Sequence, residues 1–228
     1  MMRARLLTEF AGTFIFLTAL ALSGKAGSLA PLVVGLALMA MVYMGGHVSG
    51  AHYNPAVSFG LFLRGVLPAP AMLAYWATQL VAGALAFAFA YAISGHTPGI
   101  QPGAGVAWYS ALAAEVMFTT ALVLVVMNVA ATKETSGNSF YGLAIGAVVA
   151  AGAFTAGPIS GAAFNPAVGF SATLAGALFS GGGWGDLWLY VVGPLGGAAI
   201  AAGIHAVQTM PRAPVRPERS EQTAPVNR

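Results

Sequence analysis

The chain has 228 residues, of which 58% are hydrophobic and only 7% carry a charged side chain. Soluble domains carry roughly 25% charged residues, so the composition excludes a soluble domain and predicts a membrane protein, in line with a mean hydropathy of +0.79. The net charge of +3 lies in loops and tails, which fits membrane topology better than nucleic-acid binding. Because there is no cysteine, disulfides, thiolate metal sites and a cysteine nucleophile are excluded.

Six segments are long and apolar enough to be considered as spanning helices, which need about 20 mostly apolar residues. In chain order they are Leu6–Leu22, Pro31–Gly46, Ala69–Ile93, Trp108–Ala131, Ser139–Gly157 and Leu187–Val207. The second and the fifth are the shortest, and each runs into a motif that the chain contains twice.

The basic residues predict the orientation. With six spans, only Lys25 lies on the side opposite the N-terminus, and the other bases share the N-terminal side: Arg3, Arg5, Arg64, Lys133, Arg212, Arg216, Arg219 and Arg228. By the positive-inside rule, both termini are expected in the cytoplasm and the chain in the inner (plasma) membrane. Residues 208–228 are rich in proline, arginine and glutamate, which predicts a disordered cytoplasmic tail.

The repeated motif runs from Ser49 to Phe59 and again from Ser160 to Phe170, with eight of eleven positions identical. Each copy contains Asn-Pro-Ala. Asparagine is a preferred N-cap, and proline is favoured at the first helical position, where its missing N–H costs nothing. Each motif therefore predicts the start of a helix. The apolar runs that follow are too short to span the membrane and predict re-entrant half-helices over Pro55–Leu63 and Pro166–Leu178.

The repeat extends beyond the motif. Glu9 begins Glu-Phe-Ala-Gly-Thr-Phe in the first span, and Glu115 begins Glu-Val-Met-Phe-Thr-Thr in the fourth. We expect one transmembrane domain over residues 1–207, with repeats at about 5–93 and about 108–207. Because each half has three spans, the halves insert with opposite topology, as in inverted-repeat membrane proteins. The two motifs then enter from opposite sides and meet near the midplane.

This arrangement predicts a channel. Non-helical backbone at membrane depth is tolerated only where protein buries it or where it lines a wet cavity. Two half-helix N-termini and two asparagine amides at the centre would orient water and repel cations. The motif residues expected at the pore are Asn54, Pro55, Ala56, Asn165, Pro166 and Ala167, and the expected pore carbonyls are those of Gly50, Ala51, His52, Gly161, Ala162 and Ala163.

The two glutamates within spans need a role, because a carboxylate at mid-helix costs about 3 kcal/mol on insertion scales. We expect Glu9 and Glu115 to face inward and brace the re-entrant loops through backbone N–H groups or His52; a proton relay is the alternative. His47 and His52 lack a third ligand nearby, so no metal is expected. No nucleophile–base pair or phosphate-binding loop is present either, which argues against an enzyme or a bound cofactor.

The chain resembles the aquaporins of the major intrinsic protein family. The resemblance rests on the paired Asn-Pro-Ala motifs, Ser-Gly-Ala-His before the first, the glutamates that open the first and fourth spans, and Gly193-Pro194-Leu195. It implies an all-α, aquaporin-like right-handed bundle of six transmembrane helices plus two re-entrant half-helices. It also implies a passive channel with one pore in each protomer of a homotetramer, with membrane lipid, water and small neutral solutes as its partners.

One departure from the family concerns the selectivity filter. Members usually have arginine directly after the second Asn-Pro-Ala, where this chain has Val168; the other filter positions align with Val34, Ala153 and Ala162. Such a filter has no charge and little bulk, so it predicts passage of water and of uncharged solutes such as glycerol, urea and arsenous acid. The absence of the arginine resembles a bacterial branch associated with arsenical permeation. A water-selective aquaporin and a secondary transporter are the alternatives.

Overall fold

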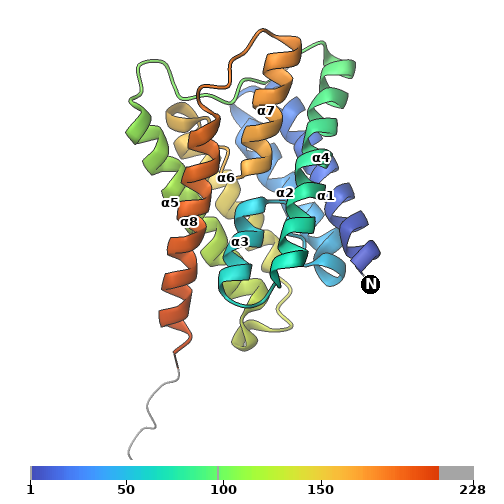
Figure 1. The fold of residues 1–228 in the computed structure, drawn as a ribbon, viewed down its shortest axis with the longest axis vertical. Coiled ribbons are helices and arrows are strands. Elements are labelled where there is room, and N and C mark those ends of the chain that lie inside the picture. Colours follow the sequence, from blue (N-terminus) through green and yellow to red (C-terminus); the bar gives the residue numbers. More distant parts are fainter. Residues whose placement is uncertain (1, 97, 211–228) are drawn as a thin grey trace, which may run out of the picture.

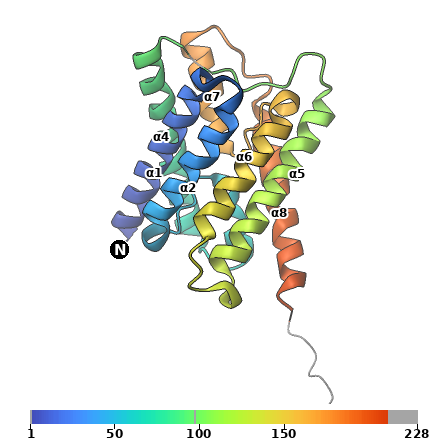
Figure 2. The ribbon, with the colours of Figure 1, turned by 180° about the vertical axis from the view of Figure 1, so that it is seen from behind.

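The computed structural model describes residues 2–96 and 98–210, and the predicted tail beyond residue 210 lies outside them. The described residues form an all-helical bundle (Figures 1 and 2). Its elements are α1 (Met2–Leu22), η1 (Ser23–Leu29), α2 (Ala30–Ser49), α3 (Pro55–Leu63), α4 (Ala69–Ser94), α5 (Trp108–Val126), η2 (Met127–Ala131), η3 (Lys133–Thr135), α6 (Tyr141–Ser160), α7 (Pro166–Phe179) and α8 (Leu187–Gln208).

The first helical stretch, Met2–Ser49, consists of α1, η1 and α2 without a break between them, and it contains two membrane spans. Five continuous stretches of the described chain are long and apolar enough to cross a membrane, and this is the first of them. The chain reverses inside it at Gly27, whose φ of 58° and ψ of −128° are non-helical. Helices α1 and α2 consequently pack side by side. Glycine suits this turn because it reaches positive φ without a Cβ clash. The bundle therefore has six spanning helices.

Two helices extend further than hydropathy predicts. Helix α2 was expected over Pro31–Gly46, and α6 over Ser139–Gly157, yet α2 reaches Ser49 and α6 runs from Tyr141 to Ser160. Each ends at a glycine in the left-handed conformation, Gly50 or Gly161, whose N–H bonds the carbonyl four residues earlier. A glycine C-cap fixes a helix end by backbone geometry, and a hydropathy window does not register that geometry.

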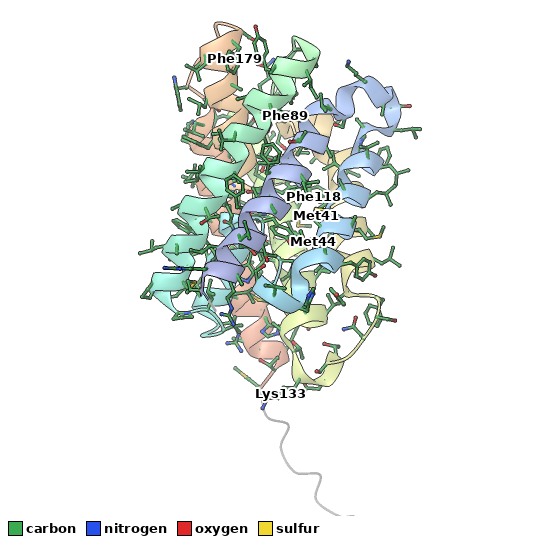
Figure 3. All side chains as sticks on the ribbon, turned by 90° about the vertical axis from the view of Figure 1, so that its right-hand side faces the viewer. Met41, Met44, Phe89, Phe118, Lys133 and Phe179 are labelled. Carbon is green, nitrogen blue, oxygen red and sulfur yellow. The ribbon has the colours of Figure 1, made fainter. Side chains whose placement is uncertain are left out.

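The two halves have the same internal contacts. Helix α1 packs against α2 and α4, and α5 packs in the same way against α6 and α8. The half-helices are exchanged between halves, because α3 packs on α8 and α7 packs on α4. The two half-helices lie in opposite halves of the bundle, whereas α1 begins and α8 ends at the same end (Figure 1). Lys133 lies at that end and Phe179, at the end of α7, lies at the other (Figure 3).

The central crossing between halves is made by α2 and α6 at two glycines. A Cβ on Gly146 would lie 2.5 Å from the Gly35 carbonyl oxygen, and a Cβ on Gly35 would lie 2.5 Å from the Gly146 carbonyl oxygen. A Cβ atom essentially never lies within 3.0 Å of a neighbouring atom. Small residues at such crossings let helix backbones meet in lipid, where no hydrophobic force drives the helices together.

We expect Gly146→Ala to destabilise the protein, because the new methyl group must push α2 and α6 apart; overpacking of this kind costs about 1–3 kcal/mol. The matched control is Gly157→Ala in the same helix, where a Cβ meets nothing within 4 Å. Thermal unfolding in detergent measures both. A Gly146→Ala midpoint equal to or above that of Gly157→Ala would contradict this account of the crossing.

Candidate functional site

The two half-helices begin in the same way. The Asn54 side-chain oxygen accepts a hydrogen bond from the Ala56 N–H at 2.8 Å, and the Asn165 oxygen accepts one from the Ala167 N–H at 2.9 Å. Both asparagines have extended backbone with φ of −157°, and a proline occupies the first helical position after each. This is the N-cap geometry that the Asn-Pro-Ala sequence favours. Both helix starts are buried.

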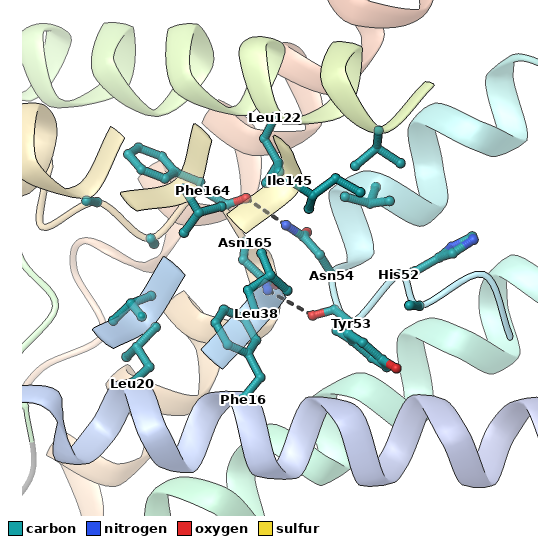
Figure 4. Close-up of a pocket in the computed structure, with 17 residues that line it drawn as sticks. Phe16, Leu20, Leu38, His52, Tyr53, Asn54, Leu122, Ile145, Phe164 and Asn165 are labelled. Carbon is teal, nitrogen blue, oxygen red and sulfur yellow. Dashed lines mark hydrogen bonds between the residues drawn. The ribbon is translucent and has the colours of Figure 1, made fainter. Parts of the chain in front are cut away.

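Each asparagine also reaches across to the other half. Asn54 Nδ2 donates to the Phe164 carbonyl at 2.9 Å, and Asn165 Nδ2 donates to the Tyr53 carbonyl at 2.9 Å (Figure 4). These reciprocal bonds bring the two helix starts together. An amide group has two N–H donors, so each asparagine keeps one beyond the bond to the opposite loop.

The loops before the half-helices have an unusual backbone. Four non-glycine residues lie at positive φ of 48–54°, at matching places in the two motifs: Ala51, Tyr53, Ala162 and Phe164. Such conformations cost of order 1–3 kcal/mol each and persist only where the surroundings impose them. Within the described chain, no group donates to the carbonyls of residues 50–52 or 161–163. Carbonyls without a protein donor are available to water or to a solute.

Glu9 imposes the first loop. Its carboxylate accepts from the backbone N–H groups of His52 at 2.9 Å and Tyr53 at 2.8 Å, and from the Ser49 hydroxyl at 2.7 Å. Gln79 Nε2 donates to it at 2.9 Å. Glu9 is fully buried. Four donors on one carboxylate offset the cost of burying it without a cation.

Glu115 holds the second loop in the same manner with fewer partners. It accepts from the N–H groups of Ala163 at 3.0 Å and Phe164 at 2.7 Å, and from the Ser160 hydroxyl at 2.7 Å. The residue equivalent to Gln79 in this half is Pro194, which has no side-chain donor. Glu9 and Glu115 therefore share two backbone contacts and one serine contact, and they differ in the contact from Gln79.

Among the described residues, the His52 ring forms no hydrogen bond with either glutamate, whereas its backbone N–H bonds Glu9. Its Nδ1 lies 2.9 Å from the Ser58 hydroxyl, and the ring packs edge-on against Tyr75 at a centroid distance of 5.0 Å. The second motif has Ala163 and Gly169 at the positions of His52 and Ser58. The histidine-containing network is thus a feature of the first half only.

A narrow cavity lies where the two motifs meet. About 30 Å³ of it is open to the centre of a water molecule, and a water needs about 10–15 Å³ of such space. One wall is polar and comes from the loops, at residues 51–54 and 162–165. The opposite wall is apolar and comes from pairs of residues four apart on α1, α2, α5 and α6: Phe16, Leu20, Val34, Leu38, Leu122, Val126, Ile145 and Val149 (Figure 4).

The four residues expected to form the filter are placed differently. Val34 and Ala162 line the central cavity. Val168 is 1% exposed and is not among the residues that line that cavity. Ala153 is half-buried on α6, one helical turn beyond the cavity-lining Val149.

Comparisons with known proteins agree with this geometry. Residues 2–205 match the family described as major intrinsic protein. Aquaporin NIP1-4 of Oryza sativa subsp. japonica is 35% identical over 86% of this chain and 74% of its own length. Probable aquaporin TIP-type alpha of Phaseolus vulgaris is 35% identical over 93% of this chain and 88% of its own length. The chain belongs to the major intrinsic protein family.

The fold agrees with a solved relative as well. The X-ray structure of the aquaglyceroporin from Plasmodium falciparum superposes with a TM-score of 0.78 over 90% of this chain and 96% of that chain, at 20% identity. The predicted all-α membrane fold with an inverted repeat is confirmed. This major intrinsic protein is a multi-pass membrane channel for water and small solutes, and it is not an enzyme.

The sequence did not identify the apolar wall of the channel. Its members, such as Leu122 with Val126 and Ile145 with Val149, lie four residues apart, which is the spacing of any packed helix face. In a chain with apolar residues on every helix face, that spacing does not separate pore-facing from lipid-facing positions. The polar wall could be predicted from the sequence, because its motif occurs twice and is polar at membrane depth.

We expect Glu9→Gln to destabilise the protein and to reduce water permeability, because an amide has one acceptor atom instead of two and turns a donor toward a loop N–H. Charge-assisted hydrogen bonds are worth about 1.5–3 kcal/mol each. Thermal unfolding and stopped-flow shrinkage of proteoliposomes measure the two effects. Glu134→Gln, an exposed residue of η3, is the matched control, and equal behaviour of the two variants would rule out the bracing role.

Proposed function

We propose that this channel passes water and small uncharged solutes, including glycerol, urea and neutral trihydroxy metalloid acids such as arsenous acid. The outer mouth that we assign to this selectivity consists of Val34, Ala153, Ala162 and Val168. The observation that supports it most directly is the residue directly after the second Asn-Pro-Ala, which is Val168 where family members usually have arginine. A short apolar side chain at this position adds neither charge nor bulk to the channel.

The chemistry of the two walls supports solutes that are themselves amphipathic. The carbonyls of residues 50–52 and 161–163, with the free N–H of each asparagine, offer hydrogen bonds along one side of the path. The other side is hydrocarbon. A polyol can turn its hydroxyls to the first wall and its carbon atoms to the second. The wall's hydrogen-bonding groups then replace the water around the hydroxyls at low cost. A cation, in contrast, is repelled by the positive N-termini of α3 and α7.

We assign residues 1–207 to a single channel domain in the plasma membrane, with both termini in the cytoplasm. The described bases support this orientation: Arg3, Arg5, Arg64 and Lys133 belong to the end of the bundle where α1 begins and α8 ends, and Lys25 belongs to the turn between α1 and α2. We further propose a homotetramer in which every protomer has its own pore.

Two other functions predict different transport. A water-selective aquaporin would accelerate water movement and leave glycerol, urea and arsenous acid at the rate of protein-free vesicles. A secondary transporter would show saturable uptake that depends on an ion gradient. We expect swelling of reconstituted vesicles in glycerol and urea gradients, with rates that rise linearly with concentration. Solute rates equal to those of empty vesicles, beside rapid water flux, would establish the water-selective alternative.

The substitution Val168→Arg tests the mouth directly. A guanidinium at this position narrows the path and offers donors to water, so we expect glycerol and urea permeability to fall about tenfold or more while water permeability stays within about twofold. Val168→Ala is the small-residue control and should retain glycerol flux. An equal loss of water and glycerol permeability in Val168→Arg would mean that selectivity is determined elsewhere in the channel.

Exclusion of protons does not depend on the mouth in this proposal. The N-termini of α3 and α7 each contribute about half a positive charge at the centre, and the two asparagine amides turn the oxygen of a passing water toward them. A water oriented in this way cannot relay a proton along the file. We expect vesicles containing the protein to dissipate a pH gradient no faster than empty vesicles, as followed with an enclosed pH-sensitive dye. A marked acceleration would contradict this central barrier.

A further inference from the structure

A cavity of about 410 Å³ lies at the end of the bundle where α1 begins. We call it the inner vestibule, because this end is the inner one in the orientation proposed above. His52 lines both the inner vestibule and the narrow central cavity, so the two spaces adjoin at that residue. A molecule that passes through the central cavity therefore also crosses the inner vestibule.

Two helix C-termini face the inner vestibule. Residues 46–49, the last turn of α2, line it, as do Ala130 and Ala131 at the end of η2, which continues α5. The C-terminus of a helix carries about half a negative charge, because its last carbonyl groups have no partner within the helix. By themselves, these two helix ends would attract cations to the inner entrance of the channel.

Arg5 opposes that attraction. Among the described residues that line the inner vestibule, it is the only lysine, arginine, aspartate or glutamate. No hydrogen bond or ion pair within the described chain involves its guanidinium, so no partner neutralises its charge. That charge also acts on the ring of His52, at the junction with the central cavity. Lys133 lines an adjoining cavity instead.

The second half of the repeat has no positive group at the equivalent position. Because Glu9 and Glu115 are equivalent, Arg5 corresponds to Ala111. The residue after the second Asn-Pro-Ala, Val168, is uncharged as well. Of these positions, only that of Arg5 carries a charge that can repel cations.

We propose that Arg5 is the residue that excludes cations from the inner entrance of this channel. Its guanidinium offsets the negative ends of α2 and η2, and it keeps metal cations and hydronium from gathering beside His52. Coulomb's law gives about a threefold change in local cation concentration for one unit charge about 6–7 Å away in water, and more beside a wall of low dielectric constant. The inference rests on the channel proposed above, and it concerns selection by charge, whereas the mouth at Val168 concerns selection by size.

The lack of cysteine in the chain allows a direct measurement of the potential in the inner vestibule. His47→Cys places a single thiol at an exposed position of the vestibule wall. A cationic and an anionic methanethiosulfonate of similar size then react with it in detergent, at low ionic strength, where screening is weak. Adding Arg5→Gln should raise the cationic rate about threefold and lower the anionic rate about threefold, so that their ratio rises about ninefold. An unchanged ratio overturns the proposal.

Three further variants in the His47→Cys background separate Arg5 from the general charge of the inner end. Arg5→Lys keeps the positive charge and should keep the ratio low. Arg3→Gln removes an equal charge from the same helix, outside the vestibule lining, and Lys133→Gln removes one from the adjoining cavity; both should change the ratio less than Arg5→Gln does. A change in either control as large as that in Arg5→Gln overturns the specific role of Arg5, and so does a high ratio in Arg5→Lys.

Potassium efflux from proteoliposomes gives the transport readout. We expect Arg5→Gln to leak potassium about threefold or more faster than the unmodified protein, because more cations reach the central barrier. Equal leak rates overturn the proposal. Water permeability of the unmodified protein is measured beside the efflux, since its absence would contradict the channel itself, whereas normal water flux with equal leak rates contradicts only the role of Arg5.

Discussion

Each half of the bundle contains a buried carboxylate that accepts hydrogen bonds from two successive backbone N–H groups of a re-entrant loop. The rest of the channel depends on these contacts. Without Glu9 and Glu115, the loops would leave N–H groups unpaired at membrane depth, where no bulk water satisfies them. With them, the N–H groups point inward to the glutamates and the carbonyls of residues 50–52 and 161–163 are left for the channel. Two buried carboxylates, which are costly to place in a membrane, thus leave one wall of the channel lined with free carbonyl oxygens.

The two halves have the same backbone arrangement at the channel centre, but their side chains differ at two motif positions near it. The reciprocal bonds of Asn54 and Asn165 fix the centre of the channel in the same way from both sides. The first half also has His52 and Ser58 where the second has alanine and glycine, and His52 lines the central cavity. The internal repeat therefore gives both halves the same backbone at the channel centre, while the residues that differ give each half its own side-chain contacts.

The half-helix α3 is tied at both of its ends. Its first turn is held at the channel centre by the Asn54 cap, and its last residue is followed by Arg64, which donates a hydrogen bond to the buried imidazole of His205 in the last turn of α8. The helix therefore links the channel centre to the end of the bundle where α8 ends.

The sequence by itself determined the membrane class, the inverted repeat and the half-helix starts, because composition, motif repetition and the capping preferences of asparagine and proline are local properties. It did not determine where α2 and α6 end, since Gly50 and Gly161 act through a backbone conformation. Only the tertiary structure decided which apolar residues face the channel and which polar groups meet His205. Those contacts join helices far apart in sequence, and on uniformly apolar helices no local pattern distinguishes one face from another.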